Sequence, residues 1–160
     1  MDKLKSKFSI EVISEKPEEI WGLCHTGEIT MGDYLETFSM SLDSWDVEDY
    51  KQQWKEGLKR IKTHDRSCLV SFVQSVDTKP MVEMWVLYKV ENTVYVQQHL
   101  LNKQILKDLN SPLNLTNFTK ENCYQFIDDR KVNAQGCGIS DSGDYEVSEW
   151  KVSLNAFDQY

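Results

Sequence analysis

The sequence lacks any long apolar run. No stretch of its 160 residues approaches the roughly 20 apolar residues of a membrane-spanning helix, and its first ten residues lack the apolar core of a signal peptide. Basic residues are also scarce, with 18 Lys and Arg against 26 Asp and Glu and a net charge of −8. Nucleic-acid binding needs a surplus of basic side chains, so we expect no direct binding of nucleic acid. From the missing apolar segments we expect a cytoplasmic protein that does not bind membranes.

Short motifs that mark common active sites are missing as well. There is no H-E-x-x-H or H-x-x-x-H pair, no C-x-x-C, no G-x-S-x-G turn and no glycine-rich phosphate loop. The acids Asp128, Asp129, Asp141 and Asp144 do not follow the spacing of an EF-hand calcium loop. We therefore predict no metal, no cofactor and no enzymatic activity.

Four cysteines stand at positions 24, 68, 123 and 137. Small secreted disulfide scaffolds are usually denser in cysteine and carry an export signal, so free thiols are predicted. Cys68 lies inside an apolar run, which is typical of a small core residue. A Cys68–His99 dyad assembled by the fold is the alternative, and it would make the chain a small α+β hydrolase. A generic adaptor or ligand-binding domain also stays open.

The sequence has enough apolar material for one core. Hydrophobic residues make up 40% of it, and it contains 5 Trp, 7 Tyr and 6 Phe. Large aromatic side chains bury roughly 150–250 Å² each. Since a chain of this length is typical of one domain, we predict a single domain over residues 1–160.

The clearest predicted element is an amphipathic helix at about residues 46–62. Its apolar residues recur at steps of three or four, at Val47, Tyr50, Trp54, Leu58 and Ile61. Asp46 is a favourable N-cap, with Asp49 completing an acidic variant of the capping box. Trp45 and Tyr50 are spaced as a hydrophobic staple. Acids in the first turn and bases in the last complement the helix dipole.

Strands are predicted where apolar residues alternate or run together, at 8–12, 28–41, 67–75, 82–90, 93–101 and 145–154. The run at 67–75 favours a central strand covered on both faces. Glu91-Asn92 suits a two-residue hairpin with Asn92 at positive φ. Short helices are predicted at 102–110 and, capped by Thr119, up to Phe126, with a glycine-rich loop at 133–144. The expected fold class is α+β, an antiparallel sheet of about five or six strands with the dominant helix packed on it.

Charge is unevenly distributed along the chain. Residues 1–50 hold 12 acids and 4 bases, residues 51–127 hold 7 acids and 11 bases, and residues 128–160 hold 7 acids and 3 bases. The net charges of these blocks are therefore −8, +4 and −4. If the two ends meet in space, they build one negative face. The alternative is an ordinary solvated surface.

Several motifs resemble a known family. The segment 40–57 reads M-S-L-D-S-W-D-V-E-D-Y-K-Q-Q-W-K-E-G. Around it stand Gly32-Asp33-Tyr34, then Ser67-Cys68-Leu69, Trp85-x-x-Tyr88 and Ser148-Glu149-Trp150-Lys151-Val152. Over roughly residues 8–155, this pattern resembles immunity proteins of bacterial contact-dependent growth inhibition systems. Its most specific part is residues 39–57.

The resemblance implies a binding function. Such proteins bind the C-terminal toxin domain of a large secreted exoprotein and block its active site, or a surface that it needs, in the cytoplasm. The toxins are often nucleases, including tRNA-cleaving ones, and a nuclease tends to present a basic cleft. An acidic inhibitor would then associate quickly and selectively. The resemblance places the shared aromatic residues in the core rather than in the interface, namely Trp45, Tyr50, Trp54, Trp85 and Trp150.

Exposed acids are therefore the predicted toxin-binding residues. The first cluster is Asp33, Glu36, Asp43, Asp46, Glu48 and Asp49. The second is Asp128, Asp129, Asp141, Asp144, Tyr145 and Glu146. Each acid has a simpler interpretation as a solvated surface group, and capping of the helix already accounts for Asp46 and Asp49.

Overall fold

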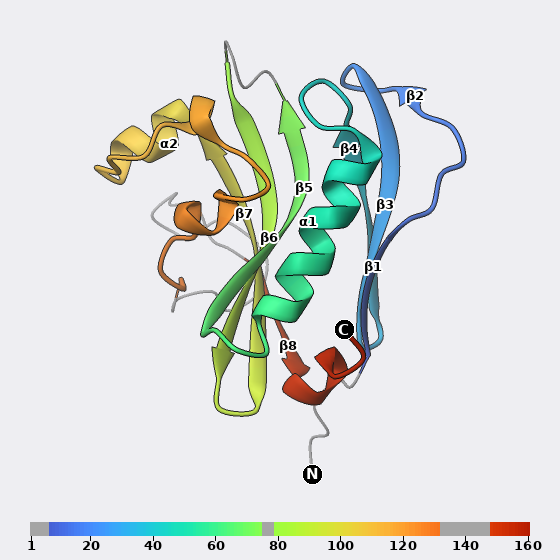
Figure 1. The fold of residues 1–160 in the computed structure, drawn as a ribbon, viewed down its shortest axis with the longest axis vertical. Coiled ribbons are helices and arrows are strands. Elements are labelled where there is room, and N and C mark those ends of the chain that lie inside the picture. The colour runs from blue at the N-terminus through green and yellow to red at the C-terminus, as the bar shows by residue number, and fades with distance from the viewer. Residues whose placement is uncertain (1–6, 75–78, 132–147) are drawn as a thin grey trace.

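The computed structural model describes residues 7–74, 79–131 and 148–160. These residues form two antiparallel four-stranded sheets and one main helix, α1 (Val47–Arg60) (Figure 1). The first sheet comprises β1 (Phe8–Val12), β2 (Glu18–Glu19), β3 (Leu23–Met31) and β4 (Tyr34–Ser41). The second sheet comprises β5 (Arg66–Gln74), β6 (Met81–Val90), β7 (Thr93–Asn102) and β8 (Glu149–Ser153), paired in that order. The α+β class is confirmed, with eight described strands in two sheets instead of five or six in one.

Helix α1 begins as its sequence predicts. Asp46 accepts a hydrogen bond from the Asp49 backbone N–H at 2.8 Å, and Asp49 accepts one from the Asp46 backbone N–H at 3.0 Å. This reciprocal pair satisfies two N–H groups that the first helical turn leaves without partners. The rings of Trp45 and Tyr50 lie 5.2 Å apart, which confirms the staple.

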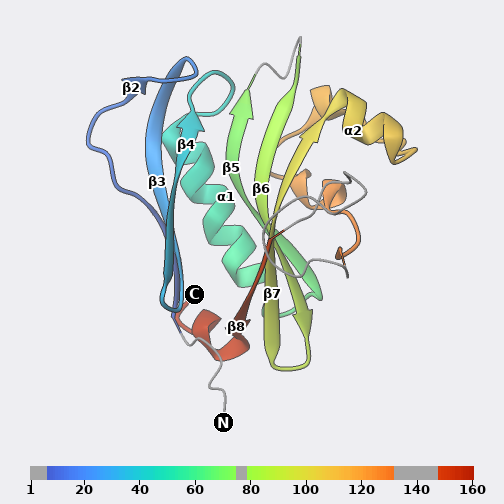
Figure 2. The same ribbon diagram turned by 180° about the vertical axis from the view of Figure 1, so that it is seen from behind.

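Side chains of α1 hold the two sheets together. The Tyr50 hydroxyl donates to the carbonyl of Ser41 in β4 at 2.6 Å and accepts from the N–H of Val73 in β5 at 3.0 Å. Trp54 Nε1 donates to the Val70 carbonyl at 2.7 Å. One buried helix face therefore contacts the edges of both sheets, and Figures 1 and 2 show β4 and β5 side by side along it.

A bulge in β5 explains one of the buried polar residues of α1. The register of β5 against β6 shifts between Val70 and Phe72. Gln53 compensates there, because its Oε1 accepts from the Val70 N–H at 2.7 Å and its Nε2 donates to the Cys68 carbonyl at 2.8 Å. Gly57 lets the helix approach closely, since a Cβ at that position would stand 2.3 Å from the Cys68 carbonyl oxygen.

Several sequence-based predictions need correction. The segment 67–75 is buried on both faces as predicted, but β5 is the edge strand of its sheet and not a central one. The segment 28–41 is a hairpin in which Gly32, at φ 65°, turns the chain between β3 and β4. In the β6–β7 turn, Glu91 and not Asn92 takes the positive φ.

The remaining elements are short. Asn102 caps α2 (Lys103–Asp108), followed by the 3-10 turns η1 (Leu115–Asn117) and η2 (Cys123–Phe126). The helix predicted after Thr119 is thus only a single 3-10 turn, although Thr119 and Asn122 form reciprocal side-chain-to-backbone hydrogen bonds ahead of it. Strand β8 runs into η3 (Leu154–Phe157). In the described part of the chain, no helix is long and apolar enough to span a membrane.

The two ends of the described chain meet. The rings of Phe8 and Phe157 pack with centroids 4.7 Å apart, and the Tyr160 hydroxyl donates to the Phe8 carbonyl at 2.6 Å. Residues at the beginning of the first sheet therefore contact the segment that follows the second sheet.

Candidate functional site

The first predicted acidic cluster is spread along the β3–β4 hairpin. Asp33 lies at the hairpin turn, while Asp43 follows the far end of β4 and precedes α1. The paired length of the hairpin, from Met31 and Tyr34 to Cys24 and Ser41, is about 23 Å at the usual rise per residue. The fold therefore separates Asp33 from the acids at the start of α1.

Two of the helix-start acids have structural partners. Asp46 and Asp49 form the capping box, and Lys120 Nζ lies 2.8 Å from Asp49 Oδ1. The hydrogen bond from Lys120 lowers the pKa of Asp49, against a smaller opposing effect of burial. Glu48 points outward, with 83% of its side chain exposed and only a 4.0 Å contact to Lys51. Of these three acids, Glu48 is thus the one most available to a partner.

Bases offset the described acids of the second cluster. Lys131 Nζ lies 2.6 Å from Asp128 Oδ2, and Arg66 lies 2.7 Å from Asp129 Oδ1. Burial alone would raise the pKa of Asp128, but the hydrogen bonds from Lys131 and the Asp129 backbone outweigh it and lower the pKa. The other members of that cluster lie outside the described residues: Asp141, Asp144, Tyr145 and Glu146.

The first sheet carries acids that the sequence-based selection omitted. Glu11 of β1 and Glu28 of β3 stand directly opposite each other in the register. Glu18 and Glu19 form β2 and are exposed. Among the described residues, no ion pair reaches any of these four glutamates. Like charges in directly opposed positions destabilise a sheet, so this sheet holds negative charge that its own fold does not neutralise.

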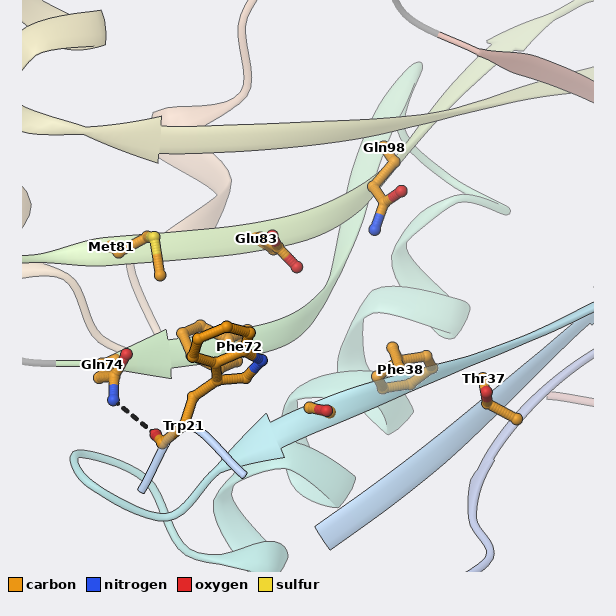
Figure 3. Close-up of a pocket in the computed structure, with 9 residues that line it drawn as sticks. Trp21, Thr37, Phe38, Phe72, Gln74, Met81, Glu83 and Gln98 are labelled. Carbon is orange, nitrogen blue, oxygen red and sulfur yellow. Dashed lines mark hydrogen bonds between the residues drawn. The ribbon is translucent and has the colours of Figure 1, made fainter. Parts of the chain in front are cut away.

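A groove of about 430 Å³ lies between β4 and the β5–β6 hairpin. Figure 3 shows its lining, with Trp21 and Phe72 at one end, Phe38 on β4, and Glu83 and Met81 along β6. Thr37, Ser39, Gln74 and Gln98 complete the lining. Aromatic, amide and carboxylate side chains from both sheets therefore meet in one depression.

Two glutamates share the electrostatics of this groove. Burial raises the pKa of Glu83, which lines the groove. Burial also raises the pKa of Glu36 on β4, and the negative charge of Glu83 raises it further. Glu36 Oε2 is buried and has no hydrogen-bond partner among the described residues. Glu36 is thus the one member of the first predicted cluster whose charge is coupled to the groove.

Trp21 forms an exposed rim of the groove. It lies in a tight turn in which the Ile20 N–H donates to the Gly22 carbonyl at 2.9 Å and Gly22 takes φ 81°. Gln74 Nε2 fixes this turn to β5 by donating to the Trp21 carbonyl at 2.7 Å. The Trp21 residue is 67% exposed, and the neighbouring Ile20 and Leu23 are also exposed. The sequence-based selection missed both Trp21 and Glu83, although a tryptophan beside a glycine turn was a usable signal for the former.

The proposed Cys68–His99 dyad is not assembled in the described structure. The Cys68 thiol is fully buried 3.7 Å from that of Cys123, and burial raises its pKa. His99 Nε2 lies 2.9 Å from Gln97 Oε1 instead. Cys24, Cys68 and Cys123 are free thiols, and Cys137 lies outside the described residues. Over the described ranges, no three His, Cys, Asp or Glu side chains gather as metal ligands.

Comparison with known proteins identifies relatives in sequence and in structure. Residues 40–160 match the family model described as the CdiI N-terminal domain. The immunity protein CdiI of Enterobacter cloacae subsp. cloacae is 30% identical over 138 residues, which cover 84% of this chain and 82% of that protein. A solved CdiA-CT/CdiI toxin and immunity complex from Enterobacter cloacae matches with a TM-score of 0.70 and 27% identity, over 95% of this chain and 94% of that one.

Proposed function

Because the chain belongs to the CdiI family of contact-dependent growth inhibition immunity proteins, we propose that it binds its cognate CdiA C-terminal toxin domain and neutralises it by forming a stoichiometric complex. The observation that carries this proposal is the likeness, over 95% of the chain, to a solved toxin and immunity complex. We place this binding in the cytoplasm and propose a basic nuclease, such as a tRNA-cleaving enzyme, as the toxin.

Inhibition here acts through binding and not through a reaction. In support, the candidate nucleophile Cys68 is buried beneath α1 with a raised pKa, and a thiol kept protonated in this way is inert. A stoichiometric inhibitor needs a surface that fits its target, and its potency depends on the life of the complex.

Electrostatic steering is the proposed route to fast association. The supporting feature is four acids of the first sheet that form no ion pair within the described ranges, namely Glu11, Glu18, Glu19 and Glu28. Glu48, whose side chain is 83% exposed, adds negative charge at the start of α1. Complementary potentials raise the association rate of charged proteins by one or more orders of magnitude.

The direct test is reconstitution with the toxin. The C-terminal domain of the exoprotein encoded immediately upstream is purified and mixed with the chain, and complex mass, Kd and toxin activity are measured. We expect a complex of fixed stoichiometry and full loss of toxin activity once the chain is equimolar. A non-cognate toxin domain is the control. Toxin activity that persists at a tenfold molar excess of the chain, a ratio chosen for the test, would overturn the proposal.

The steering component has its own test. We expect the association rate to fall steeply as salt rises from about 50 to 500 mM, since the Debye length shrinks from roughly 14 to 4 Å. Reversing the charges of Asp141, Asp144 and Glu146 together should slow association if the second cluster takes part. An association rate unchanged by that substitution would remove this cluster from the interface.

A further inference from the structure

The groove between the two sheets holds carboxylates that lack a counter-charge. Glu83 lines it, Glu36 lies close enough for the two charges to interact, and the ion pairs among the described residues include neither. A buried or half-buried carboxylate is costly unless it is paired. In the free protein, the negative charge at the groove is therefore not balanced by a basic side chain of the described residues.

The rest of the lining suits a flat cation. Trp21 and Phe72 supply aromatic faces, and Gln98 and Gln74 contribute amide groups (Figure 3). A guanidinium group stacks on aromatic rings and binds a carboxylate through two parallel hydrogen bonds, whereas an ammonium group does neither as well. The volume, about 430 Å³, falls within the range of roughly 300–1,000 Å³ found for ligand pockets.

From this combination we infer that the groove receives an arginine side chain of the bound toxin domain, with its guanidinium against Glu83 and beside Trp21. The inference rests on the proposed function and adds the chemistry of one contact. It makes the groove an anchor point, distinct from the acids that steer association. A buried charge pair acts mainly on the dissociation rate, and rim charges act mainly on the association rate.

The free protein carries a cost that such an anchor explains. The negative charge of Glu83 adds to burial in raising the pKa of Glu36, and Glu36 Oε2 is buried without a hydrogen bond among the described residues. A glutamine at position 83 would remove that charge with nearly the same shape. If the groove is retained for binding at the expense of stability, Glu83→Gln should weaken toxin binding and at the same time leave the melting temperature unchanged or raise it.

The test compares groove variants with matched controls in binding to the purified cognate toxin domain. Glu83→Gln and Trp21→Ala are the groove variants. Glu56→Gln, on the exposed face of α1 and outside the groove lining, repeats the charge change, and Leu35→Ala repeats the loss of an exposed apolar side chain. Kd, dissociation rate and melting temperature are measured for all four. We expect Glu83→Gln to raise Kd about 30-fold or more through faster dissociation, with an unchanged or higher melting temperature.

Arginine scanning of the toxin domain then identifies the partner. In a double-mutant cycle, one Arg→Ala substitution should weaken binding to the wild-type chain but add little in the Glu83→Gln background. Coupling to a lysine instead, or no coupled residue, would overturn the arginine assignment. Glu83→Gln and Trp21→Ala variants that bind within about twofold of the wild type, a factor well below that of a buried charge pair, would overturn the groove inference while the proposed function stands. Failure of the wild-type chain to bind would end both.

Discussion

The two sheets of this protein differ in how often their acidic side chains form ion pairs with bases. Around α1 and the second sheet, several acids form ion pairs with bases, namely Asp49–Lys120, Asp128–Lys131, Asp129–Arg66 and Glu149–Arg130, whereas Glu83 in the groove forms none within the described ranges. On the first sheet, Glu11 and Glu28 face each other, and Glu18 and Glu19 add to the same sign. The region of α1 and the second sheet thus holds most of the ion pairs of the described structure, and the acids of the first sheet are the ones that we propose to steer the toxin.

The family match divides the chain at nearly the same place. It covers residues 40–160, which include α1 and the whole second sheet but only the last two residues of β4. The structural match nevertheless covers 95% of the chain, so the first sheet belongs to the shared fold. We interpret α1 and the second sheet as the scaffold, and the first sheet together with the groove that both sheets line as the region adapted to the individual toxin.

The largest expected effect falls on the scaffold. Trp54 is buried, donates to the Val70 carbonyl and packs edge-on against Phe38. Trp54→Ala should lower the free energy of unfolding by about 3–5 kcal/mol, because it leaves a cavity and an unpaired carbonyl. Urea unfolding measures this, with the exposed Lys51→Ala as the control on the same helix. A loss below about 1 kcal/mol would show that α1 is not the central support.

Acid should weaken the same region through His99. Burial lowers the pKa of His99 to about 4, and the positive charge of Lys131 contributes. The imidazole thus stays neutral in the fold while the unfolded chain takes up a proton below pH 6.5. Its contribution is fully present above pH 6.5 and is lost as the pH falls to about 4, an effect on the order of 3 kcal/mol.

His99→Gln isolates this contribution. Chemical unfolding at pH 7 and pH 4.5 should show a smaller pH-dependent loss of stability in the variant than in the wild type. Glu36 and Glu83 have raised pKa values and therefore act in the opposite sense, becoming more favourable as the pH falls. Equal losses in both proteins would contradict the neutral, buried state of His99.

A smaller effect is expected at Asp46, where helix stability and toxin association can be measured separately. Asp46→Ala should cost about 1 kcal/mol of stability, because the Asp49 N–H loses its side-chain acceptor. It should leave the rate of toxin association nearly unchanged, since Asp46 serves the helix. Stopped-flow association and thermal unfolding measure the two effects, with Glu48→Ala as the neighbouring control. Slower association with unchanged stability would assign Asp46 to the interface instead.

Local elements were predictable from the sequence wherever the residues that determine them lie close together in the chain. The helix spacing, the Asp46–Asp49 box and the Trp45–Tyr50 staple all involve residues within a few positions of one another, and α1 follows them closely. The division into two sheets was not predictable in this way. It depends on Tyr50 joining Ser41 to Val73 and on a bulge in β5, which only tertiary contacts determine.

The candidate site was harder to predict than the fold. Trp21, Glu36 and Glu83 are far apart in sequence, and Glu83 stands alone in a strand within the basic middle of the chain. Proximity across the sheets, not local composition, gives these residues their shared environment. Composition did predict an acid excess in the first 50 residues, but not which acids the fold would pair with bases.

The most direct test of the proposed division is the association rate of toxin with two charge-matched variants. One carries Glu18→Lys and Glu28→Lys on the first sheet. The other carries Glu56→Lys and Glu121→Lys, exposed acids on α1 and ahead of η2. If the first sheet steers the toxin, the first variant should associate about tenfold or more slowly at low salt, and the second should lose much less. Equal slowing in both variants would mean that only net charge matters, and it would contradict the distinction between the two regions.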